Sequence, residues 1–121
     1  MANTFKVVTF AAEPASAGTA YKMYTVAGST TTVVLGLVLT NIHSSAVTAE
    51  VELVSDTGSR GGANNVTNGT SFLVKDVSIP AGSSLEVLTG GKVVLETTDY
   101  LNIDCSVADK LSGTLSIMEI T

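Results

Sequence analysis

The sequence predicts an all-β protein, a single antiparallel β-sandwich of jelly-roll or immunoglobulin-like type with about eight to nine short strands. Apolar and polar residues alternate with a period of two, and no window keeps an uninterrupted helical pattern of apolar residues. Turn-forming residues recur about every ten positions, the spacing typical of a sandwich. The 121 residues suffice for one domain, residues 1–121, with a hydrophobic core of its own.

The N-terminal half of the chain contains four predicted strands. Residues 5–10 form the first strand and residues 20–26 form the second. The third is the apolar run VVLGLVL at residues 33–39, and strict alternation marks the fourth at residues 47–53. Turn-forming residues 41–45 separate the last two strands, so we interpret these two strands as a hairpin.

The C-terminal half begins with a predicted long surface loop, residues 56–70, which contains four glycines and three asparagines. The strand that follows, residues 71–79, carries its apolar side chains in two phases. This change of phase predicts a bulge near Lys75 and Asp76. Four further short strands complete the predicted set, at residues 85–88, 92–96, 101–107 and 113–120.

The third strand is unusual because both of its faces are apolar. Its odd positions, 33 to 39, carry valine and leucine, and its even positions carry valine or glycine. The last strand is similar, since Met118 and Ile120 lie in the phase opposite to Leu115 and Ile117. Large exposed apolar patches are uncommon on monomers, so we expect the second face to be covered. The candidate oligomer face comprises Val34, Gly36, Val38, Met118 and Ile120.

Two covers for that face remain open at this stage. Residues 1–18 are a candidate N-terminal arm that packs on its own sandwich or reaches across to a neighbour. Alternatively, a second subunit covers the face, as in a homo-oligomer. The alternation of residues within strands does not separate the two.

Composition excludes several classes of partner. The chain has six Lys and Arg against eleven Asp and Glu, a net charge of −5, and its basic residues are scattered singly, so we expect no nucleic-acid partner. The apolar run is far shorter than the roughly 20 residues of a membrane-spanning helix, and the N-terminal residues do not resemble a secretory signal. We therefore expect no membrane partner. One cysteine excludes an internal disulfide, which suits assembly in a reducing compartment.

The sequence contains no motif that marks a catalytic, cofactor or metal site. His43 lies in a predicted turn without the nucleophile and acid that a catalytic triad requires. Cys105 is in phase with the apolar residues of its strand, so we expect it to point into the core as a small hydrophobic side chain. Glu50 and Glu52 share one face, and we interpret them as a solvated acidic stripe rather than a glycosidase pair. The expectation is a protein that is not an enzyme and needs no cofactor.

The loop at residues 56–70 is the main candidate for contact with another macromolecule. Glycine and asparagine permit unusual backbone shapes, and an arginine provides strong hydrogen-bond donors among small residues. Loops of this length are often functional, although a tip without a role is the alternative. The candidate partner residues are Arg60, Asn64, Asn65 and Asn68.

Several phrases of the sequence, taken in order, resemble a family of small virion proteins of tailed bacteriophages, notably those that infect marine bacteria and cyanobacteria. The phrases are MANTFK, TVAGSTTTVVLGLVLTNIHSSAVTAEVEL, FLVKDVSIPAGSSLEVLTGGKVVLETTDYLNI and SIMEIT. The resemblance covers nearly the whole chain outside residues 56–70. It implies a structural part of the phage particle, and it implies no catalytic residue.

The expected function is therefore that of a capsid decoration, or cement, protein that binds and stabilises the assembled shell. The expected partners are the phage major capsid protein and further copies of the chain, as a homotrimer at three-fold positions of the lattice. The expected location is the capsid surface, after assembly in the host bacterial cytoplasm. A head–tail connector or tail accessory protein is the alternative. A carbohydrate-binding module is a further alternative, which the absence of Trp and the presence of only three Tyr disfavour.

Overall fold

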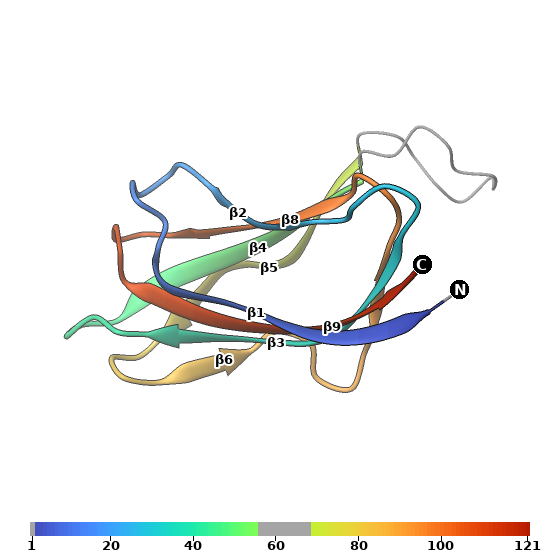
Figure 1. Ribbon diagram of the computed structural model, residues 1–121. Coiled ribbons are helices and arrows are strands. Elements are labelled where there is room, and N and C mark those ends of the chain that lie inside the picture. The colour runs from blue at the N-terminus through green and yellow to red at the C-terminus, as the bar shows by residue number, and fades with distance from the viewer. Residues whose placement is uncertain (1, 56–68) are drawn as a thin grey trace.

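A computed structural model of the chain describes residues 2–55 and 69–121, which contain nine β-strands and no helix (Figure 1). The predicted loop residues Arg60, Asn64, Asn65 and Asn68 lie outside the described residues. The strands are β1 (Asn3–Glu13), β2 (Tyr21–Thr25), β3 (Thr31–Asn41), β4 (Val47–Ser55), β5 (Gly69–Ile79), β6 (Ser84–Glu86), β7 (Val93–Leu95), β8 (Tyr100–Cys105) and β9 (Leu111–Ile120).

The strands form two antiparallel sheets that pack face to face (Figure 1). One sheet has the order β1-β9-β3-β6, with β7 also paired to β3, and is called the β9 sheet below. The other has the order β2-β8-β4-β5 and is called the β8 sheet. Along the chain, most connections pass from one sheet to the other, the pattern of a jelly roll. The predicted all-β sandwich is confirmed.

The core lies between the two sheets and is made of the residues whose alternation the sequence displays. On β8 and over residues 47–51 of β4, every second side chain is buried while its neighbours face outward. Cys105 is 4% exposed and belongs to this core, as its phase predicts. The largest fully buried side chains come from both sheets and include Leu37, Leu39, Val51, Ile79, Leu95, Leu101, Ile103, Leu111, Leu115 and Ile117.

A bulge in β3 corrects the prediction for the apolar run. Val34 pairs with Ile117 and Gly36 pairs with Ser116, so Leu35 is an extra residue that β9 does not match. Beyond the bulge the inward phase passes to Leu37. Val34 is consequently 1% exposed and lies in the core, and its prediction as part of an oligomer face is wrong.

The predicted hairpin of the third and fourth strands is also wrong, because β3 and β4 belong to different sheets. The segment between them crosses from one layer to the other around the buried side chain of Asn41. Its Nδ2 donates to the carbonyl oxygens of Ser45 and Ile79, both at 2.9 Å, and its Oδ1 accepts from the amide of His43 at 2.7 Å. Because the buried side chain of Asn41 bonds to all three partners, it stabilises a crossover between the two sheets and not a two-strand turn.

The predicted bulge near Lys75 and Asp76 is confirmed. Ala49 pairs with Val77 and Val51 pairs with Val74. Lys75 and Asp76 of β5 therefore lie opposite the single residue Glu50 of β4. Asp76 has a φ of 51°, a left-handed conformation that aspartate tolerates better than most residues.

Candidate interaction surface

The outward side of the β9 sheet carries a row of four apolar side chains on four neighbouring strands. The register places Phe5 of β1 opposite Met118 of β9, Met118 opposite Val33 of β3, and Val33 opposite Val94 of β7. Directly paired residues project from the same side of a sheet. Phe5 is 71% exposed and Val94 is 55% exposed, so the row faces outward.

Further apolar residues flank this row. Val7 of β1 is 61% exposed and Val38 of β3 is 38% exposed. Ile120 lies between Asn3 and Thr31 in the next row. We call this surface the outer apolar face and define it by Phe5, Val7, Val33, Val38, Val94, Met118 and Ile120.

Of the five residues predicted for the oligomer face, four lie on the outward side of the β9 sheet and one lies in the core. Val38, Met118 and Ile120 belong to the outer apolar face, and Gly36 lies among them on the same side of the sheet. A Cβ added at Gly36 would meet no other atom within 4 Å, so this part of the surface is smooth and open. Val34 lies in the core. The sequence alone did not identify Phe5, Val7, Val33 and Val94 as part of this surface. Alternation along a strand shows which residues share a face, but it does not show which face points into the core.

The N-terminal segment does not cover this surface. Residues 3–13 form β1, which pairs with β9 and therefore extends the β9 sheet sideways instead of lying over it (Figure 1). Of the two covers that the sequence leaves open, the chain's own N-terminal segment is excluded for the described residues. Within this part of the chain the outer apolar face is uncovered, an arrangement uncommon on monomers.

A polar cluster at one end of the sandwich positions β1. Lys6 of β1 contacts Glu119 of β9, with 2.7 Å between Nζ and Oε1. The hydroxyl of Tyr24, on β2, donates to the other oxygen of Glu119 and lies 2.8 Å from the hydroxyl of Thr32. The bonds from Lys6 and Tyr24 lower the pKa of Glu119, which favours its charged form. Burial, followed by the bond to Glu119, raises the pKa of Tyr24 to about 12.

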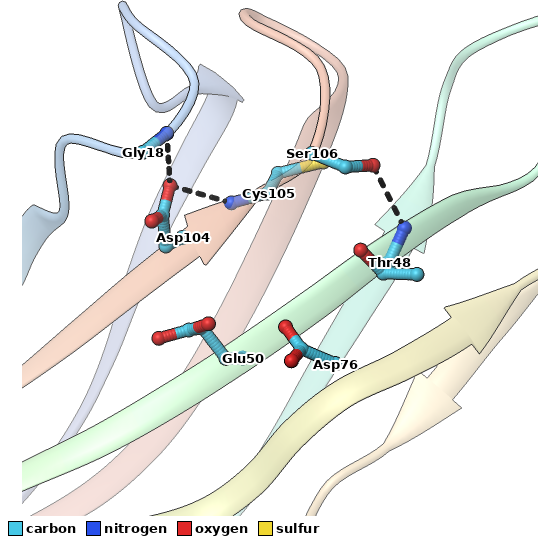
Figure 2. A pocket seen from close by; sticks show the side chains of 7 residues that line it. All are labelled: Gly18, Thr48, Glu50, Asp76, Asp104, Cys105 and Ser106. Atoms are coloured by element: carbon cyan, nitrogen blue, oxygen red, sulfur yellow. Dashed lines mark hydrogen bonds between the residues drawn. The ribbon is translucent and has the colours of Figure 1, made fainter.

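The opposite side of the sandwich carries a shallow, open depression of about 170 Å³ on the β8 sheet (Figure 2). Its lining includes three carboxylates, those of Glu50, Asp76 and Asp104. Glu50 pairs directly with Asp104 across β4 and β8. Partial burial raises the pKa of Glu50, and the charges of Asp76 and Asp104 add to this effect while Lys75 opposes it.

Much of the hydrogen bonding around this depression ties strands and loops together. Oδ1 of Asp104 accepts from the amide of Gly18 at 3.2 Å and from the amide of Cys105 at 2.8 Å (Figure 2). The amide of Thr48 donates to the hydroxyl of Ser106 at 3.0 Å. Glu50 and Glu52 project from the outward side of β4, as the predicted acidic stripe requires.

The described residues contain no group of three or more His, Cys, Asp and Glu side chains placed to hold a metal ion. His43 lies in the crossover after β3, where its amide donates to Asn41, and Cys105 lies on β8. The described segments also contain no helix long and apolar enough to cross a membrane.

Comparison with known proteins adds little. No protein-family model and no curated protein matches the chain. One solved structure with a similar chain trace comes from work titled "Bacillus endospore appendages form a novel family of disulfide-linked pili". That chain is 16% identical to this one, the alignment covers 99% of this chain and 87% of that one, and the TM-score is 0.49. A likeness at this level carries no information on function.

Proposed function

We propose that the protein is a non-enzymatic structural component of a tailed-phage virion, a capsid decoration protein that binds the assembled shell and acts as a homo-oligomer. The observation that carries the proposal is the uncovered row formed by Phe5, Met118, Val33 and Val94 on the β9 sheet. An exposed apolar patch on a well-paired sheet is the kind of surface that becomes buried against another protein.

Two further observations support a structural role. Jelly rolls are common among viral capsid proteins, although lectins and cupins share the fold, so this support is an analogy. The resemblance of the sequence to phage virion proteins points the same way. The sequence leads to the expectation of a homotrimer, but the proposal itself requires only a homo-oligomer, so the number of subunits is tested separately.

The tyrosines do not favour the carbohydrate-binding alternative. Tyr21 packs edge-on against Phe10, with 5.4 Å between ring centroids. Tyr24 uses its hydroxyl inside the sandwich, and the ring of Tyr100 lies under Nζ of Lys22 at 4.0 Å. A sugar platform needs an open aromatic face, and each of these rings is already engaged.

The proposal is tested by co-sedimentation with assembled shells that lack the protein and, separately, with free coat subunits. We expect saturable binding to shells and none to free subunits. Val94→Lys places a charge on the outer apolar face and should weaken shell binding at least tenfold. Ser78→Lys, an exposed position on the β8 sheet, is the matched control and should bind as the wild type does.

Binding of Val94→Lys with unchanged affinity would contradict the proposed surface. The number of copies per particle separates decoration from the head–tail or tail alternative. Many copies distributed over the shell support decoration, whereas a few copies clustered at one vertex would move the head–tail or tail role ahead.

A further inference from the structure

Strand β1 is an open edge of the β9 sheet. Among the described residues its partner is β9, and none of them pairs with its other side. The amide of Ala2 donates to the carbonyl of Thr121 at 3.1 Å, and the amide of Thr121 donates back at 2.9 Å, so these two residues form a hydrogen-bonded pair. The register then runs unbroken from Asn3 opposite Ile120 to Phe10 opposite Gly113.

This unbroken register fixes which backbone groups of β1 are open. In an antiparallel ladder, hydrogen-bonded and non-hydrogen-bonded pairs alternate. Because Ala2 is hydrogen-bonded to its partner, the even-numbered residues of β1 direct their amides and carbonyls to β9. Asn3, Phe5, Val7 and Thr9 direct theirs to the open edge. Two of these residues, Phe5 and Val7, also carry exposed side chains of the outer apolar face.

The other edges of the sandwich are protected in ways that β1 is not. Strands β6 and β7 have three residues each, and β2 has five residues with a register shift. Strand β5 is long, but its pairing shifts twice and the charged residues Lys75 and Asp76 lie at its bulge. Short length, bulges and charges all discourage pairing with another chain.

The one basic residue of β1, Lys6, forms an ion pair with Glu119 of the same chain. Its charge is therefore not available to discourage pairing at the open edge. The edge therefore offers eight consecutive residues in regular register, Asn3–Phe10, and six of them are Thr, Phe or Val, which have high β-propensity.

We propose that β1 pairs with β1 of a second copy of the chain in an antiparallel, two-fold arrangement that joins the two β9 sheets edge to edge. This goes beyond the proposed function, because it names the contact through which the chain associates with itself and does not depend on a virion role. A two-fold pairing closes both open edges in one step and ends in a dimer, whereas head-to-tail use of another edge would leave β1 of one copy open.

Side-chain placement supports this occupant. The open backbone groups belong to odd-numbered residues, so odd residues of one copy pair with odd residues of the other and the two outer apolar faces lie on the same side. The row from Phe5 to Val94 then continues into the second copy. Like charges directly opposite each other destabilise a sheet, so the register should keep Lys6 away from the partner's Lys6. Two registers do so, one with Phe5 and one with Val7 on the two-fold axis.

The first test is the native mass of the purified chain by light scattering, for the wild type and for Val7→Pro. We expect twice the chain mass for the wild type. Proline at residue 7 removes an amide that faces the open edge while leaving the bonds to β9 intact, so Val7→Pro should be a folded monomer. Val94→Lys, on the same face but at the far edge of the sheet, should remain dimeric. A monomeric wild type, a trimer, or a folded dimer of Val7→Pro would overturn the proposal.

Cysteine cross-linking tests the pairing without relying on proline. In a Cys105→Ala background, Phe5→Cys, Val7→Cys and Val94→Cys are oxidised separately and the covalent dimer is measured. We expect cross-linking of at least half of the chain at residue 5 or 7, whichever lies on the axis, and less than a tenth at residue 94. Equal cross-linking at all three positions, or none at residues 5 and 7, would contradict a β1–β1 contact. Shell binding by Val94→Lys tests the proposed function alone, whereas the native mass and the cross-linking test the β1–β1 contact, so the two hypotheses fail separately.

Discussion

The hydroxyl of Tyr24 donates a hydrogen bond of 2.5 Å to the carboxylate of Glu119, and this bond joins the two sheets of the sandwich. Tyr24 lies on β2 of the β8 sheet, and Glu119 lies on β9 of the β9 sheet. Lys6 contacts the other carboxylate oxygen, so one carboxylate ties together three strands, including the edge strand β1. The contact makes stability depend on pH at the alkaline end of the range.

Tyr24→Phe should lower the free energy of unfolding by about 1–2 kcal/mol at pH 8, because Glu119 and Thr32 lose a partner. The pKa of Tyr24 is raised to about 12 in the folded state, against about 10 in the unfolded chain. The contribution of the neutral phenol is therefore fully present below pH 10 and is lost as the pH rises toward 12. Denaturant unfolding between pH 8 and 12 should show a steeper loss for the wild type than for Tyr24→Phe.

Tyr100→Phe is the matched control for removal of a phenol hydroxyl, and its free energy of unfolding at pH 8 should stay within about 0.5 kcal/mol of that of the wild type. If the slopes of the wild type and Tyr24→Phe coincide, Tyr24 does not titrate as the structure indicates.

Glu50→Gln should raise the free energy of unfolding at pH 7 by less than about 1 kcal/mol. The pKa of Glu50 is raised by burial and by the neighbouring carboxylates, so its charged form costs stability above the unfolded pKa of about 4.3. Below that pH the carboxyl is protonated in both states and the gain should vanish. Unfolding at pH 3 and pH 7 measures both limits, with Glu52→Gln as a control on the same face of β4.

Gly113→Ala should destabilise the fold by about 1–3 kcal/mol. Phe10 packs its ring over Gly113, its cross-strand partner, and a Cβ there would lie 2.4 Å from two ring carbons. Gly36→Ala, on the neighbouring strand with no atom within 4 Å, should stay within about 0.5 kcal/mol of the wild type. Denaturant unfolding of both variants makes the comparison, and partial rescue of Gly113→Ala by Phe10→Leu would identify the ring as the cause.

Asn41→Ala should cost at least about 2 kcal/mol, because two carbonyls and one amide lose their partner at a buried site. Asn41→Asp keeps an acceptor for the amide of His43 but removes both donors and buries a charge, so it should destabilise the fold as well. Thermal unfolding measures both. Wild-type stability of Asn41→Asp would mean that the two donated bonds contribute nothing.

The fold class is predictable from the sequence because strands such as β4 and β8 alternate cleanly, with Val47, Ala49 and Val51 inward and Thr48 and Glu50 outward. The change of apolar phase also marks the bulge at Asp76. Strand β3 gives no such signal. Both of its faces are apolar, so the extra residue at Leu35 changes which side is inside without changing the appearance of the pattern.

The crossover after β3 was not predictable for a related reason. Asparagine is a common turn-forming residue, so the sequence gives no sign that Asn41 is buried. Its burial depends on the carbonyls of Ser45 and Ile79, which only the tertiary fold brings close to it. The outer apolar face needs the same long-range information. Phe5, Met118, Val33 and Val94 come from four separate segments, and only the register of the sheet shows that they stand in one row.

The bulge at Leu35 has a consequence for how β3 tolerates change. Leu35 is the residue that β9 does not match, so deleting it would join Val34 to Gly36 and make the register with β9 continuous. Val34 and Leu37 would then be two positions apart and both would still face the core, whereas loss of a residue beyond the bulge, such as Val38, would turn Leu39 and Asn41 toward the surface. Position 35 is therefore the place in β3 where the loss of one residue is accommodated best, and a variant shortened there should keep the side-chain orientation of the wild type on both halves of the strand.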